Sequence, residues 1–226
     1  MITIAFRRFG NGIFVPHVDV LRNLNRTFRR AELDVSYSKG FVKHMKLNLT
    51  QPLPFGIADE DAYVAADVEP GDIASALTFF NESCPPFLQA KAIYRTDKNP
   101  NLAGLVTLSD YYLPAALSPE QIDRLNNLPS DYVVRQKKGD GIVERSTEGL
   151  IKSLRASSDG VSAKLAFGNV NLRVDVLAQQ LNADFMTDFE LTRIVRLSQS
   201  LVADGVEKTA ENYLREIAAE CVFLND

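Results

Sequence analysis

The chain has 226 residues, of which 46% are apolar and 24% charged, the ordinary composition of a folded globular protein. This length suits one large domain or two domains of about 100 residues each. The sequence has no apolar run near the ~20 residues that a membrane-spanning helix needs, and its first residues lack the apolar core of a signal peptide. We therefore expect a cytoplasmic protein with no membrane segment.

The two cysteines, Cys84 and Cys221, are far apart in the sequence and predict two buried, reduced thiols. They do not form the kind of cluster that holds zinc or an iron–sulfur centre. The sequence therefore predicts no cofactor of the protein's own. Any redox or radical chemistry must belong to a partner.

Positive charge is concentrated at the start of the chain. Residues 1–50 carry nine Lys/Arg against three Asp/Glu, a net charge of +6, and the remainder carries 16 against 26, a net charge of −10. Both histidines, His17 and His44, lie in the same basic segment. This distribution predicts a surface that recognises something anionic.

The hydrophobic pattern of residues 1–96 changes period several times. Alternating apolar residues predict a strand at 2–6, and an apolar stripe at three- and four-residue spacing predicts a helix at 18–31. The predicted elements that follow are a short strand at 35–37, strands at 47–49 and 63–68, a helix at 72–81 and a strand at 88–95. The acids at 59–61 predict a solvated turn before a strand. The order β-α-β-β-α-β is that of a ferredoxin-like unit.

A polar linker at 97–101 leads into a second half with a similar order of elements. Its best-marked helix starts at Ser118-Pro-Glu-Gln, with Ser118 as N-cap, proline at the first helical position and Gln121 as the third. The predicted elements are a strand at 102–113, the helix that follows Ser118, strands at 131–137, 150–156 and 161–167, a helix at 174–181, a strand at 189–197 and a helix at 207–222. We predict an α+β fold of two tandem ferredoxin-like (βαββαβ) units with antiparallel sheets, residues 1–96 and 102–226, plus a C-terminal helix.

The helix at 18–31 presents an unusually basic face. Its solvent side carries Arg22, Arg26, Arg29 and Arg30, and Asp19 is its only acid. Surface helices commonly mix charges of both signs to gain pairs between neighbouring turns, whereas guanidinium groups match the geometry of phosphate oxygens. An anion-binding face is one interpretation, and a merely solvated face is the other.

The segment 37–46 combines cations and aromatic rings around a glycine. Its candidate binding residues are Tyr37, Ser38, Lys39, Gly40, Phe41, Lys43, His44 and Lys46. Cations beside aromatic rings suit phosphate contacts combined with base stacking, and we expect Gly40 to supply backbone geometry that other residues resist. The alternative is a solvated loop whose aromatic rings insert into the core.

His17 is expected near the N-cap of the basic helix, where unpaired backbone N–H groups favour anions. His17 and His44 are the candidate catalytic residues, because imidazole titrates near neutral pH. The alternative for His17 is a packed residue with one satisfied ring nitrogen. Asp19 could fix its tautomer, although two positions apart on a helix do not face each other. No metal site is predicted, because nothing in the spacing of these residues demands one. We expect the arginines and both imidazoles to line one open cationic concavity.

Four segments resemble a bacterial family known as the radical-SAM-linked proteins, a domain of unknown function. They are residues 12–19 (Gly-Ile-Phe-Val-Pro-His-Val-Asp), 29–31 (Arg-Arg-Ala), 37–41 (Tyr-Ser-Lys-Gly-Phe) with His44, and 52–56 (Pro-Leu-Pro-Phe-Gly). Family members typically read Phe-x-Ser-His-x-Asp and Gly-Phe-Asn-Pro-His-Pro at the first and third segments. Here Pro16 stands for the serine, and the later prolines are absent, so we expect a less rigid loop.

The resemblance implies a cytoplasmic accessory to a radical SAM enzyme, with a link to RNA or a ribonucleoprotein that fits the basic segment. The paired ferredoxin-like architecture is also similar to that of CRISPR repeat-processing endonucleases, although a fold does not carry a function. The first hypothesis is a non-catalytic module that presents RNA or another phosphate-bearing substrate to a radical SAM protein. The alternatives are a metal-independent RNA endonuclease using His17 or His44, and a protein–protein scaffold.

Overall fold

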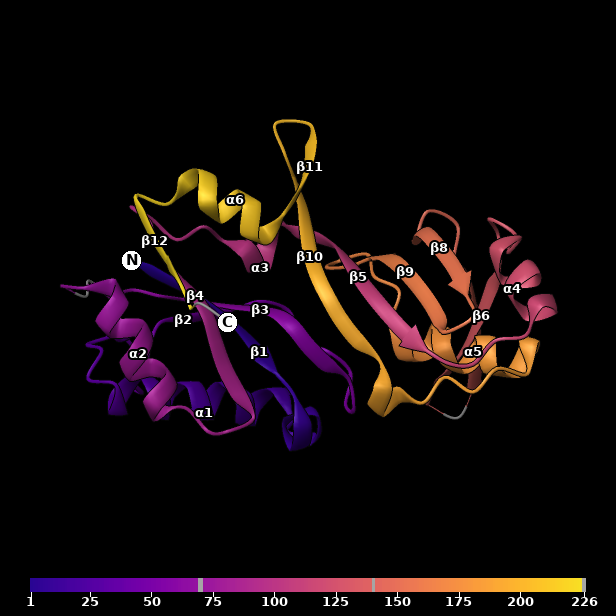
Figure 1. The fold of residues 1–226 in the computed structure, drawn as a ribbon. Helices are drawn as coiled ribbons and strands as arrows, with labels where there is room; N and C mark the ends of the chain where they lie inside the picture. The colour runs from indigo at the N-terminus through magenta and orange to yellow at the C-terminus, as the bar shows by residue number, and fades with distance from the viewer. Residues whose placement is uncertain (69–70, 140, 225–226) are drawn as a thin grey trace.

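The structure is a computed structural model that describes residues 1–68, 71–139 and 141–224. Across these residues the fold is α+β, with six α-helices, a mixed sheet of ten strands and a separate two-stranded sheet (Figure 1). None of the described helices is both long enough and apolar enough to cross a membrane. The predicted α+β class is confirmed.

The first half places two helices on one face of its strands. Its elements are β1 (Ile2–Arg8), α1 (His17–Arg30), β2 (Leu47–Leu49), β3 (Ala58–Ala66), α2 (Ile73–Ser83) and β4 (Leu88–Arg95). β1 lies between β4 and β3 with antiparallel pairing, and β2 pairs with β3. Apolar residues of β1, β3 and both helices form one core, in which the rings of Phe28 and Phe80 meet edge to face at 5.4 Å. This core holds α1 against the sheet.

The second half has a comparable order of strands and helices. Its elements are α3 (Leu102–Leu105), β5 (Val106–Pro114), α4 (Pro119–Asn126), β6 (Val133–Lys138), β7 (Gly141–Ser146), β8 (Ile151–Ser157), β9 (Gly160–Ala166), α5 (Val174–Phe185) and β10 (Val195–Ala203), with a short 3-10 turn at Leu191–Arg193. The strand order is β10-β5-β9-β8, and residues of α4 and α5 share a core with β5 and β9. β6 and β7 form the separate hairpin.

The two halves share one sheet. β3 and β10 pair in parallel over a short stretch that aligns Ala58 with Val195 and Asp59 with Arg196. A third apolar cluster draws residues from both halves, among them Tyr63 of β3, Leu102 of α3, Phe167 after β9 and Leu214 of α6. The boundary predicted near 97–101 therefore runs through a continuous sheet, and the division into two domains stays a prediction.

The predicted C-terminal helix at 207–222 is wrong at both ends. The segment forms β11 (Val206–Thr209), α6 (Ala210–Ile217) and β12 (Glu220–Phe223). Asp204 and Gly205 both have positive φ, which makes the tight turn between β10 and β11. Thr209 then caps α6 by accepting a hydrogen bond from the backbone N–H of Asn212. β12 pairs with β4, so the end of the described chain returns to the first half (Figure 1).

Several other predicted boundaries are corrected by burial and hydrogen bonding. The strand predicted at 63–68 begins at residue 58 and includes the acids expected in a solvated turn, because Asp59 and Asp61 find buried partners. The strand predicted at 189–197 is displaced to 195–203, where polar residues of β10 bond to neighbouring strands. The stretch at 102–113 opens with the helical turn α3. Residues 35–37 form only an isolated bridge, from Tyr37 to Met45.

The cysteines also differ from expectation. Cys84 is only half-buried, and its thiol donates to the backbone oxygen of Leu88 at 3.0 Å. Cys221 is exposed on β12. Both are free thiols, as expected, but the predicted burial is wrong for Cys221, because the edge strand that carries it faces solvent on that side.

Candidate functional site

Helix α1 presents its arginines to solvent because its opposite face is apolar. Val20, Leu24 and Phe28 are buried against the sheet and α2. This leaves Arg22, Arg26, Arg29 and Arg30 exposed. The helical spacing thus separates an apolar stripe from a basic one, as the sequence predicts.

The four arginines differ in their pairing. Arg22 forms an ion pair with Asp19 at 2.7 Å, so Asp19, the only acid of this helix, partly neutralises its basic face. Across residues 1–68, 71–139 and 141–224, Arg26, Arg29 and Arg30 have no carboxylate within ion-pair distance. The described neighbouring loops therefore do not pair with these three guanidinium groups, which remain available to bind an anion.

The segment 37–46 is a small hairpin-like loop that projects from the body of the protein. Ser38 holds it closed: its backbone N–H donates to the oxygen of His44 at 2.8 Å, and its Oγ accepts from the N–H of His44 at 3.1 Å. Phe41 at the tip is fully exposed, so its ring does not insert into the core. Lys39 and Lys43 are exposed on either side of that ring, whereas Lys46 lies 3.7 Å from Asp67.

Gly40 does not have the special backbone geometry that we expected. Its φ lies outside the left-handed region, and a side chain there would meet only the backbone oxygen of Val42 at 3.6 Å. The loop closes through Ser38 and His44 instead, so a glycine is not required by the local conformation.

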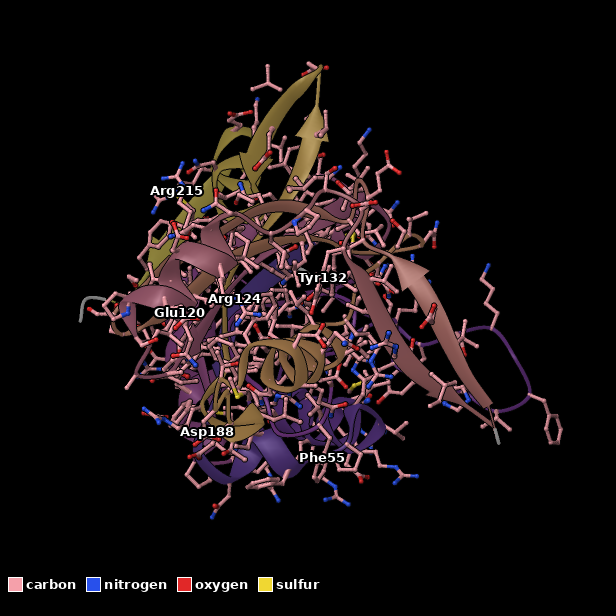
Figure 2. All side chains as sticks on the ribbon, turned by 90° about the vertical axis from the view of Figure 1, so that its right-hand side faces the viewer. Phe55, Glu120, Arg124, Tyr132, Asp188 and Arg215 are labelled. Atoms are coloured by element: carbon pink, nitrogen blue, oxygen red, sulfur yellow. The ribbon has the colours of Figure 1, made fainter. Side chains whose placement is uncertain are left out.

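The two histidines do not share a concavity. His17 is the first residue of α1, and His44 belongs to the loop that follows the other end of this helix. His17 lines a cavity with Asp59 at one end of β3, whereas His44 comes three residues before Leu47, which pairs with Ala66 at the other end of that strand. Seven steps along the strand from Asp59 to Ala66 span about 23 Å, so the predicted convergence of both imidazoles is wrong. The exposed loop and the hairpin β6–β7 do project toward the same side of the molecule, at the right of Figure 2.

His17 lies instead beside a buried cluster of charged residues. Arg196 of β10 donates two hydrogen bonds to Asp59 of β3, from Nε to Oδ1 at 3.0 Å and from Nη2 to Oδ2 at 2.5 Å. Arg8 donates to the backbone oxygens of Val15 and Ile57 at 3.2 and 3.1 Å. Burial, and then the positive charge of Arg8, lowers the pKa of His17, so its imidazole is neutral at pH 7.

Residues 1–170 match the model of a family described as an uncharacterized protein conserved in bacteria (DUF2344). The chain belongs to this family. No curated protein matches it. The part that matches the DUF2344 model includes α1, the loop 37–46 and most of the buried cluster, but Arg196 lies beyond it.

Two of the segments singled out from the sequence meet around Arg8. The backbone N–H of Gly56 donates to the oxygen of Ile13 at 2.9 Å, and the ring of Phe55, labelled in Figure 2, lies 5.4 Å from that of Phe14. Arg8 donates to the backbone oxygen of Val15, one position after Phe14, and to that of Ile57, two positions after Phe55. The buried guanidinium group of Arg8 thus links segment 12–19 to Ile57, the residue directly after segment 52–56.

Sequence reasoning missed Asp59, Arg8 and Arg196 as site residues. The stretch 58–66 carries Asp59, Asp61 and Tyr63 at alternate positions, a period-two signal that predicts one face of a strand. The partner of Asp59 lies 137 residues away, and no local pattern could identify it. In the described part of the chain, no three His, Cys, Asp or Glu side chains group as a metal site would require.

Proposed function

We propose that this protein is a binding module that holds RNA on the exposed basic surface of its first half, formed by the outer face of α1 and the loop 37–46. The single observation that carries the proposal is a set of three exposed α1 guanidinium groups, Arg26, Arg29 and Arg30, that form no ion pair with any carboxylate in the described part of the chain. Guanidinium groups match phosphate oxygens, and a surface of one sign attracts a polyanion over a distance.

The loop supplies a second kind of contact. Phe41 is fully exposed, and Lys39 and Lys43 flank it on a segment closed by Ser38 and His44. A fully exposed aromatic ring has no structural use in the free protein, whereas an unpaired base can stack on it while the lysines contact phosphates. Single-stranded RNA suits this surface better than a duplex, because bases in a duplex are already stacked.

A nuclease using both histidines is not favoured, since they lie toward opposite ends of β3. A nuclease using one histidine remains the alternative, and purified protein incubated with RNA and a chelator tests it. We expect binding without cleavage.

The test is binding of a single-stranded RNA oligonucleotide in a salt titration. The expected affinity falls as salt rises, with a log–log slope of about −0.7 for each phosphate contacted. The double substitution Arg26→Glu with Arg29→Glu should weaken binding by roughly tenfold or more at 0.1 M salt. Phe41→Ala should weaken it by about 1–3 kcal/mol with little change in the salt slope.

The matched control is Lys152→Glu with Arg155→Glu, which makes the same change in charge at two exposed positions of β8 in the second half. This control should bind RNA almost as the unmodified protein does. Equal affinity for the α1 variant and the control would refute the proposed surface.

The resemblance to radical-SAM-linked proteins supports a further part of the proposal, that the RNA is presented to a radical SAM enzyme in the cytoplasm. Purification of the tagged protein from its native cells, with and without ribonuclease, tests this part. A radical SAM protein should co-purify, and its loss after ribonuclease treatment would identify RNA as the bridge. Retention after that treatment would favour direct protein contact, as in a scaffold.

We also propose that each half is a ferredoxin-like unit. The order β4-β1-β3-β2 in the first half and β10-β5-β9-β8 in the second support this, because the corresponding strands and helices follow in the same sequence order. The hairpin β6–β7 is then an insertion between α4 and β8.

A further inference from the structure

We infer that the small cavity beside the amino-terminal end of α1 is a binding site for the terminal oxygen of a phosphate group, separate from the arginine face of α1. The cavity has a volume of about 20 Å³ and lies where the first half meets β10. Its polar wall is formed by Arg8, His17, Thr50, Gln51, Asp59 and Arg196. A space of this size accommodates one water molecule or one oxygen atom of a larger ligand whose remainder stays outside.

The charge of the wall is positive because its one carboxylate is already neutralised. Oδ1 of Asp59 accepts from Nε of Arg196 and from the backbone N–H of Asp61, and Oδ2 accepts from Nη2 of Arg196. Arg8 bonds only to backbone carbonyls, and no described carboxylate forms an ion pair with it. Asp59 therefore attracts both Arg8 and Arg196, and the lining carries two guanidinium groups against one carboxylate, a net positive charge that favours an anion.

The same wall holds unused hydrogen-bond donors. Arg196 is only 1% exposed, and its Nη1 has no hydrogen-bond partner among the described residues. The N-cap of α1 is Pro16, which gives no side-chain hydrogen bond to the first turn. The backbone N–H groups of Asp19 and Val20 both donate to the oxygen of Pro16 at 2.9 Å, whereas no described side chain caps those of His17 and Val18, so the positive end of the helix dipole lies beside His17.

These features together favour phosphate. Guanidinium groups, imidazoles and helix amino termini are donors that bind phosphate oxygens in proteins. Two guanidinium groups and the imidazole of His17 line this cavity, and His17 is the first residue of α1. Two sources can supply such an oxygen: free inorganic phosphate, and the phosphorylated 5′ end of an RNA. Both place the same chemical group at the mouth of the cavity, so the two sources must be separated by experiment.

The first experiment measures thermal unfolding of the full chain in 10 mM inorganic phosphate against chloride at equal ionic strength. Phosphate should raise Tm by roughly 2–4 °C, because a ligand that binds only the folded state stabilises it. His17→Glu places a carboxylate at the wall and should abolish the rise. His44→Glu makes the same change on the remote loop and should keep it.

The variant His17→Glu should fold, because an acidic residue in the first turn favours a helix, and its Tm in chloride checks this. If phosphate leaves the Tm of the unmodified protein unchanged, or raises that of His17→Glu equally, the inference is overturned and the cavity holds only water.

The second experiment compares one RNA oligonucleotide with a 5′-phosphate and with a 5′-hydroxyl. Tighter binding of the phosphorylated form, lost in His17→Glu, assigns the site to an RNA end. A rise in Tm with phosphate but no preference between the two oligonucleotides assigns it to free phosphate. Arg26→Glu with Arg29→Glu should weaken the binding of both RNAs equally and leave the phosphate-dependent rise in Tm intact. The proposed phosphate site and the proposed RNA surface can therefore be refuted independently.

Discussion

Asp59 and Asp61 stand two positions apart on β3 and are both buried, yet their surroundings differ. Asp59 has a guanidinium partner in Arg196. Asp61 has only neutral partners for its carboxylate, the hydroxyl of Tyr63 at 2.6 Å and the backbone N–H of Gln199 at 2.7 Å. Burial raises the pKa of Asp61 to about 6, because these hydrogen bonds do not fully replace the water that the carboxylate loses.

This raised pKa makes stability depend on pH between the unfolded value of 3.8 and the native value of about 6. The folded state binds the proton of Asp61 more tightly than the unfolded state does, so protonation of Asp61 stabilises the fold. This contribution to the free energy of unfolding, about 3 kcal/mol, is complete below pH 4 and is lost as pH rises through 6. Asp61→Asn should remove this slope, which urea unfolding at pH 4.0 to 6.5 would measure. The exposed Asp97→Asn should retain it, and an unchanged slope in Asp61→Asn would contradict the assignment.

At the scale of single elements, strong local signals were predicted correctly. The strand at 88–95 and the strand at 47–49 have the expected bounds. The capping box of α4 is present as the sequence indicates: Oγ of Ser118 accepts from the N–H of Gln121, and the side chain of Gln121 accepts from the N–H of Ser118. Each of these features depends on residues within one or two turns of the chain.

Elements that depend on distant partners were missed. β10 begins later than predicted because Ser198 and Gln199 bond to Asp110 and Asp61, which lie on other strands. The basic face of α1 follows from periodicity alone, but the buried cluster needs the pairing of β3 with β10. For the same reason the joint concavity of His17 and His44 was predicted wrongly: the distance between them depends on the pairing of β2 with the end of β3 that is remote from Asp59.

The cap of α4 gives a prediction at this scale. Ser118→Ala should lower the free energy of unfolding by about 1 kcal/mol, because the N–H of Gln121 loses its acceptor. Chemical denaturation measures the change. The matched control is Ser130→Ala, an exposed position in the loop after the same helix, which should change stability by less than about 0.5 kcal/mol. Similar losses in both variants would argue against the cap.

On the scale of the whole molecule, the two halves share one continuous ten-stranded sheet. β10 pairs with β3 of the first half and with β5 of the second, and the third apolar cluster combines Tyr63, Phe167 and Leu201. Loss of either half would expose this cluster and break the buried pair of Asp59 with Arg196. The halves should therefore not unfold independently, whatever their separate topologies.

Differential scanning calorimetry tests this expectation. We expect one transition whose calorimetric enthalpy equals its van't Hoff enthalpy, as in a two-state protein. Arg196→Met should lower the temperature of that single transition, because Asp59 is left buried without its cation. Two resolved transitions, with only one of them shifted in Arg196→Met, would show that the halves unfold separately.

The return of β12 to the edge of β4 has a consequence for biosynthesis. Glu220–Phe223 pair with Ala92–Arg95, more than a hundred residues earlier in the chain. While a ribosome is still translating the intervening residues, β4 therefore presents an unpaired edge, a template for mispairing with other nascent chains. The amino-terminal half can complete its own hydrogen bonding only after the last strand has emerged from the exit tunnel.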